Sequence, residues 1–429
     1  MPHIFHRYIE QRLDALVPFY RGFHLYGLKQ IGKTTTLLPY VTRLYRGDSL
    51  QHFQMLFPTP EHSVRQNVSF AIIEWQVLQN EWYVLRYHLR YQRHPRKLFI
   101  TTSHLPSNLS ISDFSTIHLP SLHIRPLSIP ERDISEPSID IRALMRGHYR
   151  DVKAYSSWTF KDYFYALCST GFPSLQGLSS SERNAQLSNY LRSLINSAVS
   201  PTRHCRKETI SFLWQWLNVY AAASSTPKPI TAVTKQAFSS TPYRMSMSSV
   251  RRYFKTFIHT WLLEPMPAWC PLHESQLHTS ALVKHYFSDP GIAAYLLGIA
   301  PHTFHSDSLS DSHSPNENDI NSALFESFAA LSFRVFADMI GARVYHFRSR
   351  DCHHHVDFVV DLRDGSVLLV EVVFQPVIVY EHVRDLLWLR RQLSKTIVND
   401  CVVVYPGHYA YRRSDGIAVI PLACLGIFI

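Results

Sequence analysis

Short apolar runs alternate with longer periodic segments over the first third of the chain. The runs FHLYG (23–27), SFAIIEW (69–75) and KLFITTS (97–103) each have the length of one strand. Continuous apolar strands separated by helical segments are typical of a parallel sheet that is covered on both faces. We therefore predict an α/β domain over residues 1–135, closed by the Pro- and Ser-containing segment 124–138.

The next part of the chain has apolar and aromatic residues at helical spacing. Examples are WTFKDYFYAL (158–167), LSNYLRSLINSAV (187–199) and ETISFLWQWLNVYAAA (208–223), which predict a helical lid within residues 136–270. Residues 230–269 then indicate a helix, a Ser-rich turn, a second helix and an apolar strand. This order suits a winged-helix module whose basic face is Arg251, Arg252 and Lys255; a helical pair packed on the α/β domain is the alternative.

The C-terminal part, residues 271–429, is predicted to form a second α/β domain. It contains a Ser-, His- and Asp-rich segment, 302–318, that is nearly free of apolar residues and is expected to be a flexible loop. Periodic and apolar segments then predict helices at 321–340 and 380–393 and strands at 342–349, 354–361, 366–374 and 400–406.

The segment GLKQIGKT (27–34) lies between the first predicted strand and a helical segment and matches G-x-x-x-x-G-K-[ST]. Glycines at both ends let backbone N–H groups face phosphate, and the following helix start adds a favourable potential. Lys33 is expected to reach the β and γ phosphates and Thr34 to supply a hydroxyl to Mg²⁺. The predicted residues for binding ATP with Mg²⁺ are Gly27, Gln30, Gly32, Lys33, Thr34 and Thr35.

Hydrolysis requires a carboxylate for the metal's water shell and a base for the attacking water. The second strand offers only Glu74, because Ile73 precedes it, so one carboxylate must serve where two are usual. Glu74 is the candidate catalytic residue; capping the strand and facing water is the alternative. Thr101 and Ser103, at the end of the next strand, are candidate sensors of the γ-phosphate. The pattern favours nucleotide binding with weak or absent turnover.

Composition sets limits on location and partners. Hydrophobic residues make up 46% and charged residues 18%, a globular balance, and the net charge of +10 makes a polyanion such as DNA a plausible partner. The six cysteines form no C-x-x-C pair, the N-terminus has no apolar signal region, and apolar runs are shorter than a membrane span. We expect a cytoplasmic protein without membrane contact.

Several further motifs occur in a fixed order: RPLSIPE (125–131), TGFP (170–173), MPAWCP (266–271) and YFSDPGIAAYLLG (286–298). With the phosphate loop and AIIEWQ (71–76), they resemble a family of bacterial and archaeal AAA-type ATPases. That family carries a C-terminal domain of unknown function with a PD-(D/E)XK nuclease-like fold. The resemblance implies a degenerate member, because Ile73 stands where the family has an aspartate and no Gly-Arg element precedes the final ATPase strand.

The resemblance also implies a remnant of a nuclease site at Glu326, Asp357 and Glu371. Such a site needs carboxylates for Mg²⁺ and a lysine to stabilise charge, but Val373 stands where the family pattern places the lysine. We therefore expect a structural or binding role. Cys352 and the histidines at 353–355 suggest a metal site, but adjacent strand residues point to opposite faces, so an ordinary turn entering a strand is the simpler interpretation.

Three functions remain open from the sequence. The first is an ATP-binding protein with slow or absent hydrolysis, for which DNA is a candidate partner. The second is a non-enzymatic DNA-binding or protein-interaction module that keeps the same fold. The third is a metal-dependent nuclease with a relocated lysine such as Lys395.

Overall fold

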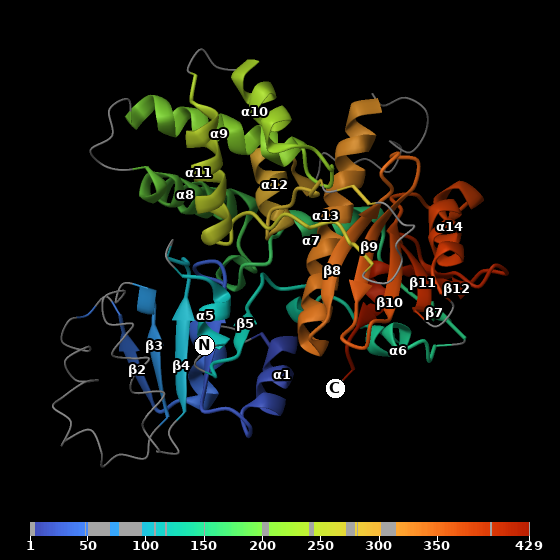
Figure 1. Cartoon of the computed structure of the whole chain (residues 1–429), viewed down its shortest axis with the longest axis horizontal. Helices are drawn as coiled ribbons and strands as arrows, with labels where there is room; N and C mark the ends of the chain where they lie inside the picture. The colour runs from blue at the N-terminus through green and yellow to red at the C-terminus, as the bar shows by residue number, and fades with distance from the viewer. Residues whose placement is uncertain are drawn as a thin grey trace.

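The computed structural model describes residues 5–47, 49, 69–76, 97–106, 109–115, 118–149, 151–199, 206–239, 244–271, 279–280, 282–301, 315–394 and 397–428. A parallel sheet, a group of helices and a larger mixed sheet surround one long helix, α13 (Pro315–Ile340) (Figure 1). α13 begins within the segment predicted as a flexible loop; the rest of that segment, 302–314, lies outside the described residues.

The first sheet is wholly parallel, with the strand order β2–β3–β4–β1–β5, and confirms the parallel sheet predicted from the apolar runs. β1 and β4 lie at its centre and are almost entirely buried, as their apolar sequences require. Its strands are β1 (Gly22–Tyr26), β2 (Arg43–Arg46), β3 (Phe70–Ile73), β4 (Leu98–Thr102) and β5 (Ser121–His123). The helices of this part are α1 (Tyr8–Leu16), α2 (Lys33–Leu37) and α5 (Ile111–Ser115).

The helical part contains the helices predicted within residues 136–270: α7 (Phe160–Cys168), α8 (Ser180–Ala198), α9 (Arg206–Ala222), α10 (Ile230–Ser239) and α11 (Met247–His259). α12 (Pro290–Leu296), which was not predicted as a helix and falls in the range assigned to the second α/β domain, packs against α7 and α9. Isolated β-bridges also join three extended segments, 224–227, 263–266 and 284–287. Along the chain the order is thus α9, extended segment, α10, α11 and two further extended segments.

The second sheet has seven strands in the order β7–β12–β13–β11–β10–β9–β8, and β10, β11 and β13 are mutually parallel. Side chains alternate between its faces: Leu368 and Val370 join the core beneath α13, whereas Leu369 joins the core beneath α14. The elements are α14 (Arg384–Gln392), β7 (Ala154–Tyr155), β8 (Arg343–Arg348), β9 (His355–Asp361), β10 (Val367–Val372), β11 (Val398–Tyr405), β12 (Tyr409–Arg412) and β13 (Ala418–Pro421).

Residues 139–155, predicted within the helical lid, pack against the C-terminal part of the chain. β6 (Ile139–Asp140) pairs with β14 (Leu425–Gly426), β7 pairs with β12, and α6 (Ile141–Met145) packs against β10 and β11. Two-residue strands carry no readable alternation of side chains, so the sequence pattern could not place them.

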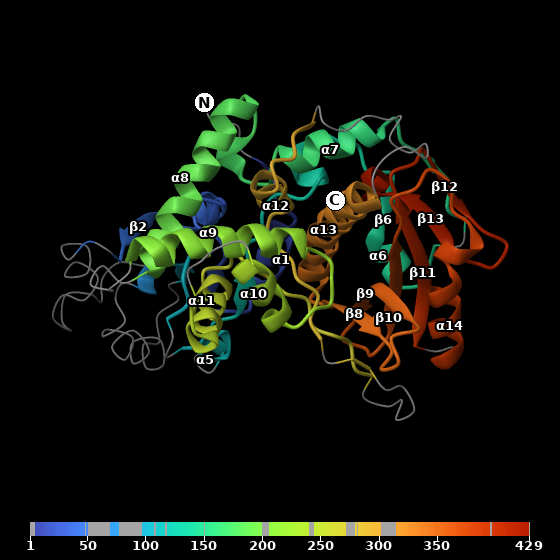
Figure 2. The same ribbon diagram turned by 90° about the horizontal axis from the view of Figure 1, so that it is seen from above.

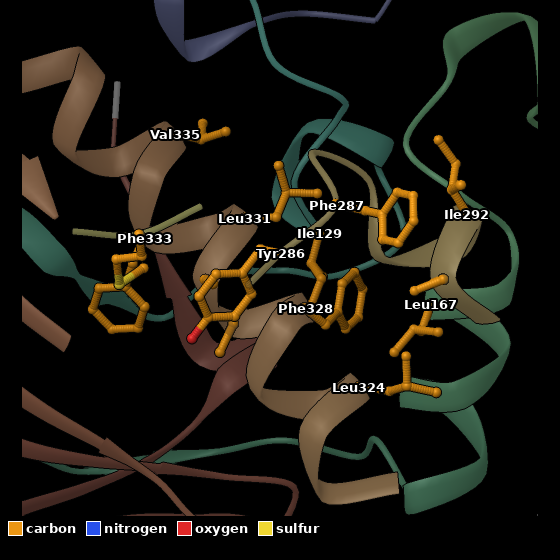
Figure 3. Packing of buried hydrophobic residues seen from close by; sticks show 14 of the residues in the cluster. Ile129, Leu167, Tyr286, Phe287, Ile292, Leu324, Phe328, Leu331, Phe333 and Val335 are labelled. Atoms are coloured by element: carbon orange, nitrogen blue, oxygen red, sulfur yellow. The ribbon is translucent and has the colours of Figure 1, made fainter. Parts of the chain in front are cut away.

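The parallel sheet and the mixed sheet lie on opposite sides of α13, as the view from above shows (Figure 2). One continuous apolar core joins the parts: Ile129 from the first, Leu167 and Phe287 from the helical part, and Phe328 from α13 pack together (Figure 3). None of the helices in the described residues combines the length and apolar composition needed to cross a membrane.

Candidate functional site

The loop between β1 and α2 is a tight turn in which three positions restrict the residue type, either by their φ angle or by lack of space. Gln30 and Gly32 have φ values of 68° and 93°, in the left-handed region, where glycine is least strained. A side chain at Gly27 would place its Cβ 2.1 Å from the carbonyl oxygen of Ile124, so glycine is required there for space. The glycines at both ends of the motif thus stand where the backbone conformation or the available space favours glycine.

Lys33 lies inside this loop. Its Nζ donates hydrogen bonds to the carbonyl oxygens of Gly27, at 3.0 Å, and Leu28, at 2.6 Å. Burial lowers the pKa of Lys33 to about 8, and nearby Lys29 acts in the same direction, whereas Glu74 opposes the shift. An anion in the loop would satisfy this buried ammonium and raise its pKa.

Arg7 contacts the phosphate loop on the side away from the cavity, a role that no sequence motif indicates. Its Nη1 donates to the carbonyl oxygen of Ile31 at 3.0 Å, and its Nε lies 3.5 Å from Glu131. Glu131 in turn accepts hydrogen bonds from the backbone N–H groups of Tyr8 and Ser128, both at 2.9 Å. The RPLSIPE motif thus supplies the carboxylate that positions Arg7 behind the phosphate loop.

The predicted strand-end residues do meet at one edge of the first sheet. Glu74 follows β3 with a φ of 55°, and its backbone N–H donates to Thr101 Oγ1 at 3.2 Å. Its carboxylate accepts hydrogen bonds from the Ser103 hydroxyl and the Gln76 amide. Thr101 is fully buried and supports the Glu74 backbone, whereas Ser103 faces the adjacent cavity.

A cavity of about 560 Å³ opens between the phosphate loop, these strand ends and helices α8 and α11. The cavity lies outside the carboxyl ends of the parallel strands, which is where proteins with parallel α/β sheets commonly bind their ligands. One face of α8, with polar residues three to four positions apart, forms the opposite wall. The polar lining residues are Lys29, Gln30, Gln76, Ser103, His104, Gln186, Asn189, Tyr190, Ser193, Ser197, Thr256 and Thr260.

Two motifs distant in sequence meet beside the phosphate loop. The backbone N–H of Gly171, in TGFP, donates to Asp289 at 2.7 Å, and the same carboxylate accepts from Gly291 at the start of α12. A Cβ at Gly171 would lie 2.6 Å from Pro126 Cβ, so the turn packs directly on the RPLSIPE segment. Pro173 lies 3.7 Å from the Cβ position of Gly32. The lid turn is therefore in contact with the loop.

The basic residues Arg251, Arg252 and Lys255 are exposed on α11, as predicted. Thr256 of the same helix and Thr260, which directly follows it, line the cavity beside the phosphate loop. One helix thus presents a basic surface to solvent and polar side chains to the candidate ligand site.

Two of the three acidic residues predicted as a nuclease remnant contact a buried lysine, Lys284, which no sequence motif indicates. Lys284 Nζ lies 2.6 Å from Asp357 and 3.0 Å from Glu326. The second carboxylate oxygen of Asp357 accepts from the backbone N–H of Val372 at 2.9 Å. Glu371, by contrast, lies 3.7 Å from the exposed imidazole of His355, and one of its buried oxygens has no hydrogen bond to any residue that the structure describes.

The charges in this cluster balance without a metal. Lys284 and His355 hold the pKa of Asp357 below its usual value against the cost of burial. Burial and the neighbouring Asp357 raise the pKa of Glu326 to about 7 and that of Glu371 well above its usual range. One ammonium therefore faces Asp357, and the raised pKa values shift Glu326 and Glu371 toward the neutral form.

Magnesium of the nuclease type does not fit this arrangement. Both oxygens of Asp357 are engaged, and an ion would have to displace the Lys284 ammonium. Across the described residues, no group of three His, Cys, Asp or Glu side chains is placed to hold a metal ion. Lys395, the relocated lysine considered above, lies outside the described residues.

The histidine run also differs from a metal site. His354 and His355 both direct Nδ1 to Asp385, at 2.9 Å and 3.2 Å. Both side chains reach the same carboxylate because β9 begins only at His355. His354 precedes the strand, so its side chain does not have to point to the opposite face.

Two protein families match parts of the chain. A family described as "Domain of unknown function (DUF4143)" matches residues 321–425, and one described as "Domain of unknown function (DUF8612)" matches residues 160–303. No curated protein matches the chain.

Two solved structures are similar to parts or most of the chain. The Walker-type ATPase PABY2304 of Pyrococcus abyssi is 14% identical, with a TM-score of 0.40, over 68% of this chain and 96% of that chain. Protein VC1899 from Vibrio cholerae is 9% identical, with a TM-score of 0.20, over 94% of each chain. Similarities at this level say nothing about activity.

Proposed function

We propose that this chain is a cytoplasmic ATP-binding protein of the AAA type that binds the nucleotide with Mg²⁺ in the loop Gly27–Thr34. The observation that carries the proposal is the buried Lys33 ammonium inside a left-handed turn that adjoins a cavity of about 560 Å³. Thr34, which follows Lys33, would supply the hydroxyl to Mg²⁺, and the metal would neutralise phosphate charge. The five described cysteines carry free thiols, in keeping with a reducing compartment.

Slow or absent hydrolysis is part of the proposal. Glu74 is the carboxylate at the strand ends, and Ser103 and Gln76 already hydrogen-bond it. No arginine lines the cavity among the described residues, so the developing charge on a transferred phosphoryl group lacks that support. Steady-state phosphate release is the test: brisk turnover that Glu74→Gln abolishes would contradict this part.

We also propose that the C-terminal domain has a nuclease-like fold and no nuclease activity. Two of its acidic residues, Glu326 and Asp357, contact the Lys284 ammonium at the place where a nuclease would bind its metal. Supercoiled plasmid should remain uncut in Mg²⁺ or Mn²⁺, and metal-dependent nicking that Asp357→Asn removes would overturn this assignment.

DNA binding is the second candidate, favoured by one specific observation. The order α9, extended segment, α10, α11 and two further extended segments supports a winged-helix interpretation, and α11 exposes Arg251, Arg252 and Lys255. Contacts to phosphate make affinity fall steeply with salt. A gel shift that weakens with salt and is lost when the three residues become alanine supports it, whereas binding that ignores their loss contradicts it.

A further inference from the structure

The hydroxyl group of Ser103, which follows β4, is bound to the carboxylate of Glu74. It donates a hydrogen bond to Glu74 Oε2, and the side-chain amide of Gln76 donates to the same oxygen. Thr101 Oγ1 accepts from the Glu74 backbone N–H at 3.2 Å and so helps to fix this residue. Ser103 and Gln76 line the cavity of about 560 Å³, whereas Glu74 is not among the described residues that line it. The cavity therefore meets these two side chains, and the carboxylate lies behind them.

This arrangement decides which kind of hydrogen bond Ser103 can form with a ligand. A serine hydroxyl has one proton to donate and two lone pairs that accept. The bond to the Glu74 carboxylate, of the strong charge-assisted kind, uses that proton, so none remains for a phosphate oxygen. The γ-phosphate sensor predicted from the sequence needs such a free donor. Ser103 held in this way can only accept, and its bond to a carboxylate makes the oxygen a better acceptor.

A nucleotide that binds with Mg²⁺ offers donors to such an acceptor through the waters of the metal. Mg²⁺ keeps several of its waters when it binds phosphate. Lys29 of the phosphate loop lines the same cavity as Ser103. Burial lowers the pKa of Lys33, and the nearby Glu74 carboxylate opposes that shift. The strand ends and the phosphate loop are therefore neighbours around one cavity.

We propose that Ser103 accepts a hydrogen bond from a water of the nucleotide-bound Mg²⁺, and that Glu74 is the positioning residue that orients its hydroxyl. The inference rests on the nucleotide binding proposed above. β3 is followed by a single carboxylate, because Ile73 precedes Glu74, and Ser103 and Gln76 engage that carboxylate. Ser103 thus transmits the charge of Glu74 to the water shell of the metal, as hydrogen-bonded outer partners do at other metal sites.

The test measures binding of a non-hydrolysable ATP analogue by calorimetric titration, in Mg²⁺ and in EDTA. Ser103→Ala should lower the affinity in Mg²⁺ about fivefold, the scale of one hydrogen bond, and change the affinity in EDTA less than about twofold. Ser103→Thr keeps the hydroxyl and should bind like wild type. The matched control is Ser110→Ala, which removes a hydroxyl that donates to an exposed carboxylate, Asp113, at 3.0 Å; it should leave both affinities unchanged.

A double variant tests the role of Glu74. Glu74→Ala should cause the same loss in Mg²⁺ alone, and adding it to Ser103→Ala should cause little further loss, because Glu74 acts through Ser103. Losses that add overturn the positioning role. An equal loss in Mg²⁺ and EDTA indicates a direct phosphate contact and overturns the inference, as does unchanged binding by Ser103→Ala, while nucleotide binding itself stands. Wild-type protein that binds the analogue in neither condition contradicts the proposed function and this inference with it.

Discussion

Replacing Lys284 with methionine tests the charge balance of the C-terminal cluster. The change keeps most of the side chain's volume and removes the ammonium that lies 2.6 Å from Asp357 and 3.0 Å from Glu326. Removing one partner of a buried ion pair costs about 3–5 kcal/mol, because the remaining charge is left in an apolar environment. The pKa values of Glu326 and Glu371 are raised, whereas that of Asp357 is lowered, so the cost falls mainly on the Asp357 carboxylate.

The expected signal is a large change in thermal unfolding. At roughly 2–4 °C for each kcal/mol in a unit of this size, Lys284→Met should lower the melting temperature by about 6–20 °C at neutral pH. Calorimetry should show this loss in the transition that includes β9 and β10. Because the lost partner leaves Asp357 free to take up a proton, the difference from wild type should shrink as the pH falls.

Two variants make the result specific. Lys153→Met removes a lysine from an exposed pair with Asp151, 2.9 Å apart, and should change the melting temperature by about 2 °C or less. The double variant Lys284→Met/Asp357→Asn removes the orphaned charge and should recover much of the loss. A shift for Lys284→Met no larger than that of the exposed control, or no recovery in the double variant, would refute the account of this cluster.

Three further outcomes follow from the same contacts. The pKa of Glu326 is raised to about 7, above its ordinary value of about 4.5 in the unfolded chain. The protonated group therefore contributes its full stability below about pH 4.5, and this contribution is lost as the pH rises through 7. The melting temperature of the wild type should fall between about pH 5 and about 8, and Glu326→Gln should make that fall smaller. Arg7→Ala removes the donor to Ile31 behind the phosphate loop, and ATP affinity measured by calorimetry should fall about tenfold; an unchanged affinity would show that the brace is dispensable. In the absence of nucleotide, Mg²⁺, Mn²⁺ or EDTA should leave the wild-type melting temperature unchanged, and a metal-induced rise that Asp357→Asn abolishes would contradict the metal-free cluster.

Much of the architecture could be predicted from local patterns. The buried strands of the first sheet are continuous apolar runs, and the helices of the middle region have aromatic residues at helical spacing, so both signals survive in the sequence. The two-residue strands β6 and β7 have no such signal. Their pairing with β14 and β12 is decided by contacts between residues more than 250 positions apart.

In the candidate site too, features with a local sequence signal could be predicted, and features that depend on distant residues could not. The phosphate loop could be located because its turn requires glycine at fixed spacing. Arg7 and Lys284 could not, because each acts through partners far along the chain, Glu131 for the first and Asp357 for the second. The polar stripe of α8 at positions 186, 189, 193 and 197 was readable as one helix face, but nothing in the sequence showed that it faces the loop.

Binding of ATP by wild type and Lys33→Ala is the most direct measurement of the central claim. Titration calorimetry with ATP and Mg²⁺ should show one site in the wild type, an affinity at least about tenfold lower in Lys33→Ala, and no change in Lys161→Ala, at an exposed lysine of α7. The loss is expected because Lys33 is the buried cation of the loop. Absence of binding in the wild type, or equal binding by wild type and Lys33→Ala, would contradict the account.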